Sequence, residues 1–425
     1  MLILANLGRR NEHLKPPEHV QDVASVLKDP IDLIETFGPL SGMHAAMAVQ
    51  GVGMPCGIVA RFKETSSNDV AAAVEKTVGQ FPILDRQVSW AENRPILINT
   101  DTTHRSTKDL TTKSLFDLNC TCWRYRVRQY GMDTWFTAIW PHAMADGPSM
   151  LRFLETVAAI IANQSRPSYR YQGRRQIAHQ PMAEWVIRFL IDQSRRYLRP
   201  SEQRFPPGVA WCTLQREFSR QLIENSRAAR SSAAAWLAAA VCVALCEQKC
   251  VTKGLVLLNI QVERGSLERL GGFGFAAGSL FMPVKIRPDC PLPALARSIF
   301  DRLSSMIERG WDSNFDRFVG SSSRRHHWLA RLHARGRHAP IVSVSWKGSR
   351  WELGRQDKIR DIACFALSPV LHVSAHLDWT GMSLSVTSPQ SADDRRDLLR
   401  RIVHQIYGRM PDRTLTFNGL DIADC

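Results

Sequence analysis

The sequence predicts a mixed α/β protein built from two domains. A chain of 425 residues is long for a single hydrophobic core, and two domains of about 200 residues each are the expectation for this length. Apolar residues make up 44% of the chain and charged residues 22%, which is the balance of an ordinary globular protein. Segments with the composition and period of strands alternate with helical segments, so we expect both kinds of element in each half.

The first part of the chain contains a helix between strand-like segments. Residues 43–62 are apolar and interrupted by glycine, which is typical of a strand pair or of a strand with a bulge. Ser66 and Asp69 have the spacing of a capping box, and the Ala- and Val-rich stretch after them is expected to be helical to about Gln80. Beyond that helix, two further segments have strand composition, 86–90 and 96–99.

A β-hairpin follows and leads into the segment that carries the chemistry. Residues 122–129 alternate bulky and basic side chains, residues 134–140 are β-branched and aromatic, and a turn sequence separates them. The sequence Asp-Gly-Pro at 146–148 marks the next helix start, because proline is tolerated in the first turn, where its missing N–H would have no helical partner. The spacing of apolar residues carries this helix to about position 163.

The second half is joined to the first by an arginine-rich linker. The polar stretch of about 164–207 is the expected crossover, so we place an N-terminal domain at 1–185 and a C-terminal domain at 186–425. Helices are expected at 217–229, 232–249, 293–309 and 393–407. Strands are expected at 255–262, 280–286, 341–346, 371–378 and 383–387, with a glycine cluster at 271–278.

The net charge of +15 favours anionic partners through long-range attraction. Many of the arginines lie in two stretches, 166–204 and 324–337, for which a solvated surface is the simplest interpretation. Neither stretch interleaves aromatics or belongs to a nucleic-acid fold signature, so we do not expect nucleic acid to be a primary partner. No run reaches the roughly 18 apolar residues of a transmembrane segment, which leaves only peripheral membrane contact open.

The ten cysteines show neither the spacing of a disulfide framework nor that of a zinc site. Cys242, Cys246 and Cys250 recur every four residues and would line one face of a helix as small apolar packers. The first residues do not have the order of a secretory signal. We therefore expect a reducing, cytoplasmic location and no bound metal.

The strongest candidate for chemistry is His142, which follows the second strand of the hairpin. A histidine at a strand end can project from a loop that is held on both sides, and imidazole titrates near neutral pH, so it can take a proton from a hydroxyl or an amine. Asp146 can hold the loop by capping the helix or by pairing with an arginine, and Gly147 permits a tight backbone turn. The run 142–147 thus has the form HxxxDG.

With this motif the sequence resembles the chloramphenicol-acetyltransferase-like acyltransferases. The superfamily includes the BAHD acyltransferases, the condensation domains of nonribosomal peptide synthetases and the wax-ester synthases. Arg264 falls where the family has the arginine of its "D-L-R" segment, ahead of a glycine turn. The segments that resemble those of the family occur in the family's order: 81–86, 116–126, 231–232, 262–278 and 342–346.

The resemblance implies two domains, each a mixed sheet flanked by helices, with an active-site tunnel between them. His142 would be the general base of an acyl transfer from acyl-CoA or an acyl-carrier protein to a small-molecule acceptor, without a covalent acyl-enzyme or a further cofactor. Backbone N–H groups near Gly147 and a hydroxyl of Ser343 or Ser345 would bind the oxyanion. Asp146 would be structural, with Arg264 as its candidate partner.

Two departures from the family pattern narrow this interpretation. Condensation domains have two consecutive histidines, and Pro141 replaces the first of them here, which favours ester or simple amide formation over peptide synthesis. The "D-F-G-W-G" run of BAHD enzymes is absent, and residues 272–275 only partly match it. Two alternatives stay open: a standalone condensation-like enzyme that forms amides, and a catalytically silent scaffold of the same fold that binds a carrier protein.

Overall fold

The computed structural model describes most of both halves of the chain. The segment 165–207, which contains the predicted linker and the boundary at 185/186, lies outside the described residues, and so does Arg264. The described residues are 31–33, 37, 39–50, 53–91, 94–99, 120–164, 208–248, 255–263, 273–274, 277–286, 290–320, 322–334, 341–347, 359–367, 371–377, 381–388, 390–408 and 417–420.

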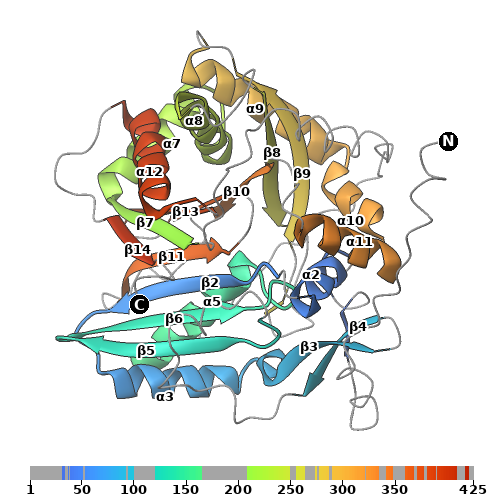
Figure 1. Ribbon diagram of the computed structural model, residues 1–425. Helices are drawn as coiled ribbons and strands as arrows, with labels where there is room; N and C mark the ends of the chain where they lie inside the picture. The colour runs from blue at the N-terminus through green and yellow to red at the C-terminus, as the bar shows by residue number, and fades with distance from the viewer. Residues whose placement is uncertain are drawn as a thin grey trace.

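The N-terminal half is organised around a four-stranded antiparallel sheet (Figure 1). Two helices, α3 (Ser67–Val78) and α5 (Gly147–Ile161), contact each other and the strands of this sheet. Helix α2 (Pro39–Val49) packs beside a smaller sheet of β1 (Ile31–Asp32), β4 (Arg94–Asn99) and β3 (Arg86–Ala91). In order across the four-stranded sheet, the strands are β11 (Ile359–Ala366), β2 (Cys56–Phe62), β6 (Asp133–Trp140) and β5 (Arg124–Tyr130).

The C-terminal half is a seven-stranded mixed sheet. Strand β10 (Ile341–Lys347) runs parallel to both of its neighbours, and the other pairs are antiparallel. In order, the strands are β14 (Phe417–Leu420), β7 (Gly208–Gln215), β13 (Gly381–Ser388), β12 (His372–Leu377), β10, β8 (Leu255–Glu263) and β9 (Ala277–Lys285). The helices of this half are α7 (Arg216–Ala228), α8 (Ala233–Glu247), α9 (Leu292–Glu308), α10 (Asn314–Val319), α11 (Ser323–Ala334) and α12 (Ala392–Tyr407).

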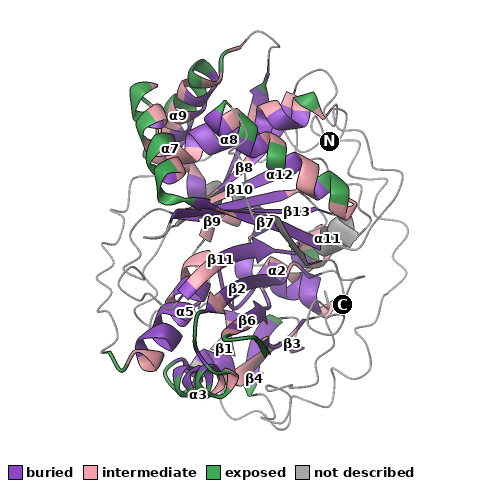
Figure 2. Cartoon of the chain, turned by 90° about the vertical axis from the view of Figure 1, so that its left-hand side faces the viewer, coloured by how far each residue is buried: buried purple, intermediate pink, exposed green. Residues whose placement is uncertain are grey.

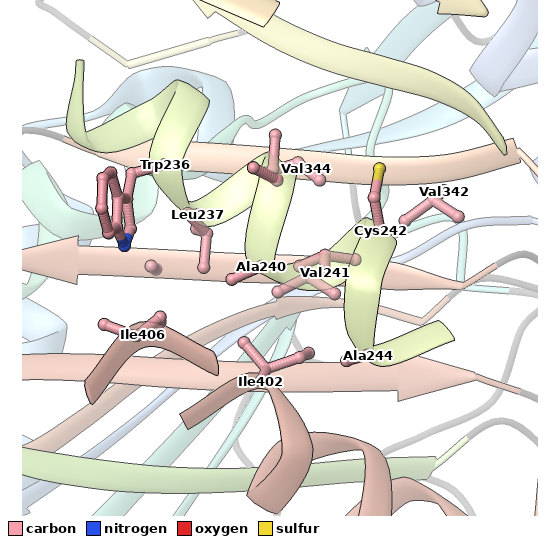
Figure 3. Packing of buried hydrophobic residues seen from close by; sticks show 14 of the residues in the cluster. Trp236, Leu237, Ala240, Val241, Cys242, Ala244, Val342, Val344, Ile402 and Ile406 are labelled. Carbon is pink, nitrogen blue, oxygen red and sulfur yellow. The ribbon is translucent and has the colours of Figure 1, made fainter. Parts of the chain in front are cut away.

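The core of the C-terminal half lies between its sheet and helix α8 (Figure 3). The alanines of α8 let its backbone lie close to the strands, where Val342 and Val344 pack against it. Cys242 is fully buried in this cluster, and burial raises the pKa of its thiol. The prediction that Cys242 acts as an apolar packer is therefore confirmed. Cys246 is half-buried against the same cluster, and Cys250 lies outside the described residues.

Strand β11 links the two halves, because it comes from the second half and pairs with β2 of the first. It also contacts β12 and β13 of the seven-stranded sheet, and Ser385 Oγ on β13 donates a hydrogen bond to Cys364 O on β11 (2.6 Å). Figures 1 and 2 both show β11 at the junction between the two sheets. Phe273, from the predicted glycine cluster, packs in the N-terminal core. The two halves thus share strands and core residues.

Most of the predicted elements are present, and the exceptions have physical reasons. Residues 43–49, predicted as strand, are helical in α2; that prediction was wrong, because the segment is rich in Ala and Met and begins with Pro39 in the first turn. The basic stretch 324–337, interpreted as solvated surface, contains α11, which packs against α2. Strands β7 and β11 were not predicted from the sequence.

Candidate active site

His142 lies where the chain leaves the four-stranded sheet. Strand β6 ends at Trp140, whose side chain is fully buried and stacks on Trp123, so the strand end is firmly held. Residues 142–144 form a turn, and Met144 N donates to Pro141 O (2.9 Å). Helix α5 begins at Gly147, and His142 is half-buried between the two elements. This is the strand–turn–helix position that the sequence predicted.

The imidazole of His142 has a defined tautomer. Its Nδ1 lies 2.8 Å from Ala145 O, and a carbonyl oxygen only accepts hydrogen bonds, so Nδ1 carries the proton in this contact. In the neutral ring, Nε2 is then the nitrogen with the lone pair. Cys56 Sγ donates to the same carbonyl (3.3 Å), which holds the acceptor in place. The arrangement prepares His142 to accept a proton at Nε2.

Asp146 anchors the loop at the start of α5. It is the N-cap of α5 and nearly fully buried; its Oδ1 accepts a hydrogen bond from the backbone N–H of Ser149 (3.0 Å) and lies 2.9 Å from the Ser149 hydroxyl. Its own N–H donates to Gly274 O (3.2 Å), which comes from the second half of the chain. Gly147 and Pro148 then start the helix without a clash in the first turn.

Helix α2 closes the site from the other side. Ser41 Oγ donates to Ala143 O (2.9 Å), inside the HxxxDG loop. One turn further along α2, the buried ring of His44 lies against His142, with ring centroids 4.5 Å apart and planes inclined by 46°. The loop is therefore fixed by α2, by the cap of α5 and by Gly274.

Ser343 and Ser345 lie on β10 in the seven-stranded sheet. Because Val342 and Val344 face the core under α8, the two serines face the opposite surface of the sheet, the one that β11 partly covers. Ser343 is buried and its Oγ accepts a hydrogen bond from Gln261 Nε2 (3.3 Å); Ser345 is half-buried. That either serine belongs to the same site as His142 stays a prediction.

The residues that sequence reasoning missed are His44, Ser149 and Gly274. Ser149 stands three residues after Asp146, which is the spacing of a cap contact and would have identified it. Gly274 lay in the glycine cluster, but nothing in the sequence assigned it to His142's loop. His44 was hidden by the wrong strand assignment for 43–49.

Within the described ranges, no three His, Cys, Asp or Glu side chains are grouped so as to hold a metal ion. Over the same ranges, no single helix is long and apolar enough to cross a membrane, while α7 and α8, bent by 96° at their junction, pass the length and composition test only as a pair.

No protein-family model matches the sequence, and no curated protein matches it. Solved structures do. Polyketide synthase associated protein 5 from Mycobacterium tuberculosis superposes with a TM-score of 0.61 at 12% identity, over 89% of this chain and 100% of that one. The trichothecene 15-O-acetyltransferase from Fusarium sporotrichioides gives 0.60 at 10% identity, over 86% and 93%.

The first condensation domain of the CDA synthetase gives a TM-score of 0.56 at 13% identity, over 88% of this chain and 94% of that one. At these identities the similarity concerns the fold. The chain therefore shares its two-lobed fold with a condensation domain and with an acetyltransferase, and this is the fold that its sequence resemblance predicted.

Proposed function

We propose that this protein transfers an acyl group from a CoA or carrier-protein thioester to a hydroxyl or amine of a small acceptor, with His142 as the general base. The observation that carries the proposal is the bond between His142 Nδ1 and Ala145 O, because it leaves Nε2 as the basic nitrogen on a loop braced by both halves of the chain. The similar structures include an acetyltransferase and condensation domains, which supports acyl transfer on this fold.

In the proposed reaction, His142 Nε2 takes the proton of the acceptor as its oxygen or nitrogen attacks the thioester carbonyl. The tetrahedral intermediate carries its negative charge on the former carbonyl oxygen, and backbone N–H groups near Gly147 together with Ser343 or Ser345 would donate to it. When the C–S bond breaks, the leaving thiolate takes the proton from His142, which returns to its neutral form. No step needs an acyl-enzyme or a metal.

The proposal keeps the two-domain arrangement with an active-site tunnel, with the donor entering on one side and the acceptor on the other. Asp146 acts as a structural anchor, and Arg264 remains its proposed ion partner. Pro141, in the position of the first histidine of condensation domains, favours an ester or simple amide as the product. The net charge of +15 suits both donors, since CoA carries phosphates and carrier proteins are acidic.

The test measures thiol release from a panel of acyl-CoA and acyl-carrier-protein donors with hydroxyl and amine acceptors. We expect His142→Ala to lower kcat/KM by about 10²–10⁴-fold, the usual contribution of a general base. His404→Ala is the matched control, because His404 is exposed on α12. Intact-protein mass spectrometry after incubation with donor alone is expected to show no added acyl group.

Turnover that is unchanged in the His142→Ala variant would rule out the mechanism. Tight binding of a carrier protein by the wild-type chain, without turnover of any donor, would favour the silent scaffold.

A further inference from the structure

The histidine His44, on α2, faces His142 across the site. Its ring is buried, and the two ring centroids are 4.5 Å apart. This placement is fixed by the surroundings: Ser41, one turn earlier on α2, donates to Ala143 O in the HxxxDG loop, and Ala45, Ala46 and Met47 are buried in the N-terminal core. A helix held at both its loop contact and its core face keeps the two imidazoles together.

We propose that His44 is a positioning residue of the acyl-transfer site, which packs against the His142 ring and opposes its protonation, so that His142 stays a neutral base. The inference rests on the proposed function for its catalytic meaning. The geometry supports two effects. The tilted ring contact limits rotation of the His142 side chain about its χ2 bond, and a positive charge on one imidazole opposes a positive charge on the other at this separation.

The two histidines are 98 positions apart, and Pro141 occupies the place directly before His142. A proline has no side-chain nitrogen, so a second imidazole reaches His142 from α2 instead of from the neighbouring position in the chain. Because His142 Nδ1 is engaged with Ala145 O, contact with His44 acts on a ring whose tautomer is already set. His44 then influences when the ring protonates, while Ala145 determines which nitrogen is basic.

Other charged or titratable groups lie on the elements packed against α2, and the test must separate them from His44. His327 contacts Gln50, directly after α2, and its ring lies tilted against Trp90, with ring centroids 4.6 Å apart. The described groups on these elements are Arg324, Arg325, His326 and His327 on α11, Asp316 and Arg317 on α10, Arg86 on β3, and Arg94 on β4.

The experiment follows the ring of His142 by NMR in the full chain labelled with ¹³C-histidine, with His142→Ala used to assign its signal. We expect a broadened titration in the wild type, because two rings share their proton equilibria. In His44→Phe, which keeps an aromatic ring but removes both nitrogens, we expect a simple titration whose midpoint is higher by about 0.5–1 pH unit. The acid limb of the kcat/KM profile is expected to move upward by the same amount.

His44→Gln is the second variant, in case phenylalanine disturbs folding; it removes the titrating ring and keeps a polar side chain. His327→Phe is the matched control, because that histidine contacts Gln50, directly after α2, and lies against Trp90. An unchanged His142 midpoint in both His44 variants, or an equal shift in His327→Phe, would overturn the proposal.

The two proposals fail separately. If the midpoint moves but no donor is turned over, the coupling of the two histidines stands and acyl transfer is wrong. If His142 is essential for turnover but its titration midpoint is the same in the His44 variants, the acyl-transfer proposal stands and the proposed role of His44 is wrong.

Discussion

Ser149 and Gly274 are in hydrogen-bond contact across 125 positions of sequence. Gly274 N donates to Ser149 Oγ (3.0 Å), and Ser149 Oγ lies 2.5 Å from Gly274 O. The hydroxyl has a single proton, so it donates either to Gly274 O or to Asp146 Oδ1 (2.9 Å), while it accepts from Gly274 N. The start of α5 is thereby tied to the second half of the chain, directly behind the HxxxDG loop.

We expect Ser149→Ala to lower both stability and activity, because it leaves buried partners at Asp146 and Gly274 without their hydroxyl. The free energy of unfolding is expected to fall by about 1–3 kcal/mol, the cost of an unsatisfied buried group. Ser66→Ala is the control: it removes the exposed N-cap contact of α3, which lies far along the chain from His142. Urea unfolding and thiol-release assays of both variants test the prediction: Ser66→Ala loses about 1 kcal/mol of stability but keeps its kcat/KM. Equal effects of the two variants on kcat/KM would contradict it.

We expect Gly57→Ala to destabilise the contact between β2 and β11. A Cβ at this position would lie 2.5 Å from Cζ of Phe365, and that ring is buried and has little room to move. A loss of about 1–3 kcal/mol in the free energy of unfolding is expected from such overpacking. Gly79→Ala is the control, since its Cβ would meet Lys76 O at 3.7 Å and its φ of −59° suits alanine. Thermal unfolding that ranks Gly79→Ala as the less stable variant would count against this packing.

We expect Ser343→Ala to lower kcat while leaving KM nearly unchanged, if its hydroxyl donates to the oxyanion. Because Gln261 donates to Ser343 Oγ, the proton of the hydroxyl remains available for donation. The expected loss in kcat is about 10²–10³-fold, typical of removing one oxyanion donor. Ser383→Ala is matched to it, a buried serine of the same sheet whose Oγ has no hydrogen-bond partner among the described residues. A similar kcat for both variants would show that Ser343 is not the oxyanion donor, which leaves Ser345 and the backbone N–H groups near Gly147 as candidates.

We expect the protein to lose stability in mild acid partly through His326. Burial lowers the pKa of this imidazole below its ordinary value of 6.5, the bond to Gly320 O acts in the opposite sense, and the charges of His327 and Arg325 lower it further. As pH falls through about 6.5, His326 binds a proton in the unfolded chain but not yet in the folded chain, so the free energy of unfolding decreases. His326→Gln removes this contribution.

The measurement for His326 is urea unfolding at several pH values between about 5.5 and 7.5, with His404→Gln as the exposed-histidine control. The slope of unfolding free energy against pH is expected to be shallower in His326→Gln than in the control. Parallel slopes in the two variants would exclude His326 as the origin.

Local sequence determined the elements whose stabilising contacts are short-range. Ser66 and Asp146 cap their helices through contacts three residues away, and the hairpin of β5 and β6 closes through a two-residue turn. The position of His142 between a strand and a helix follows from those same local rules. For Asp146 the sequence left helix capping and pairing with an arginine open, and in the structure Asp146 caps α5.

The rest depended on contacts between distant residues, which no local pattern encodes. Residues 43–49 have an apolar composition that suits strand or helix, and packing against α10 and α11 accompanies the helical outcome. Strand β11 pairs with the edge strand β2, in a sheet whose other strands come from the first half of the chain. This pairing joins residues that are far apart in the sequence, so no local pattern predicts it. The sequence therefore identified His142 on a loop between a strand and a helix. Only the fold placed Gly274 behind that loop and His44 beside the His142 ring, because these residues are distant in the sequence and come together when the core is buried.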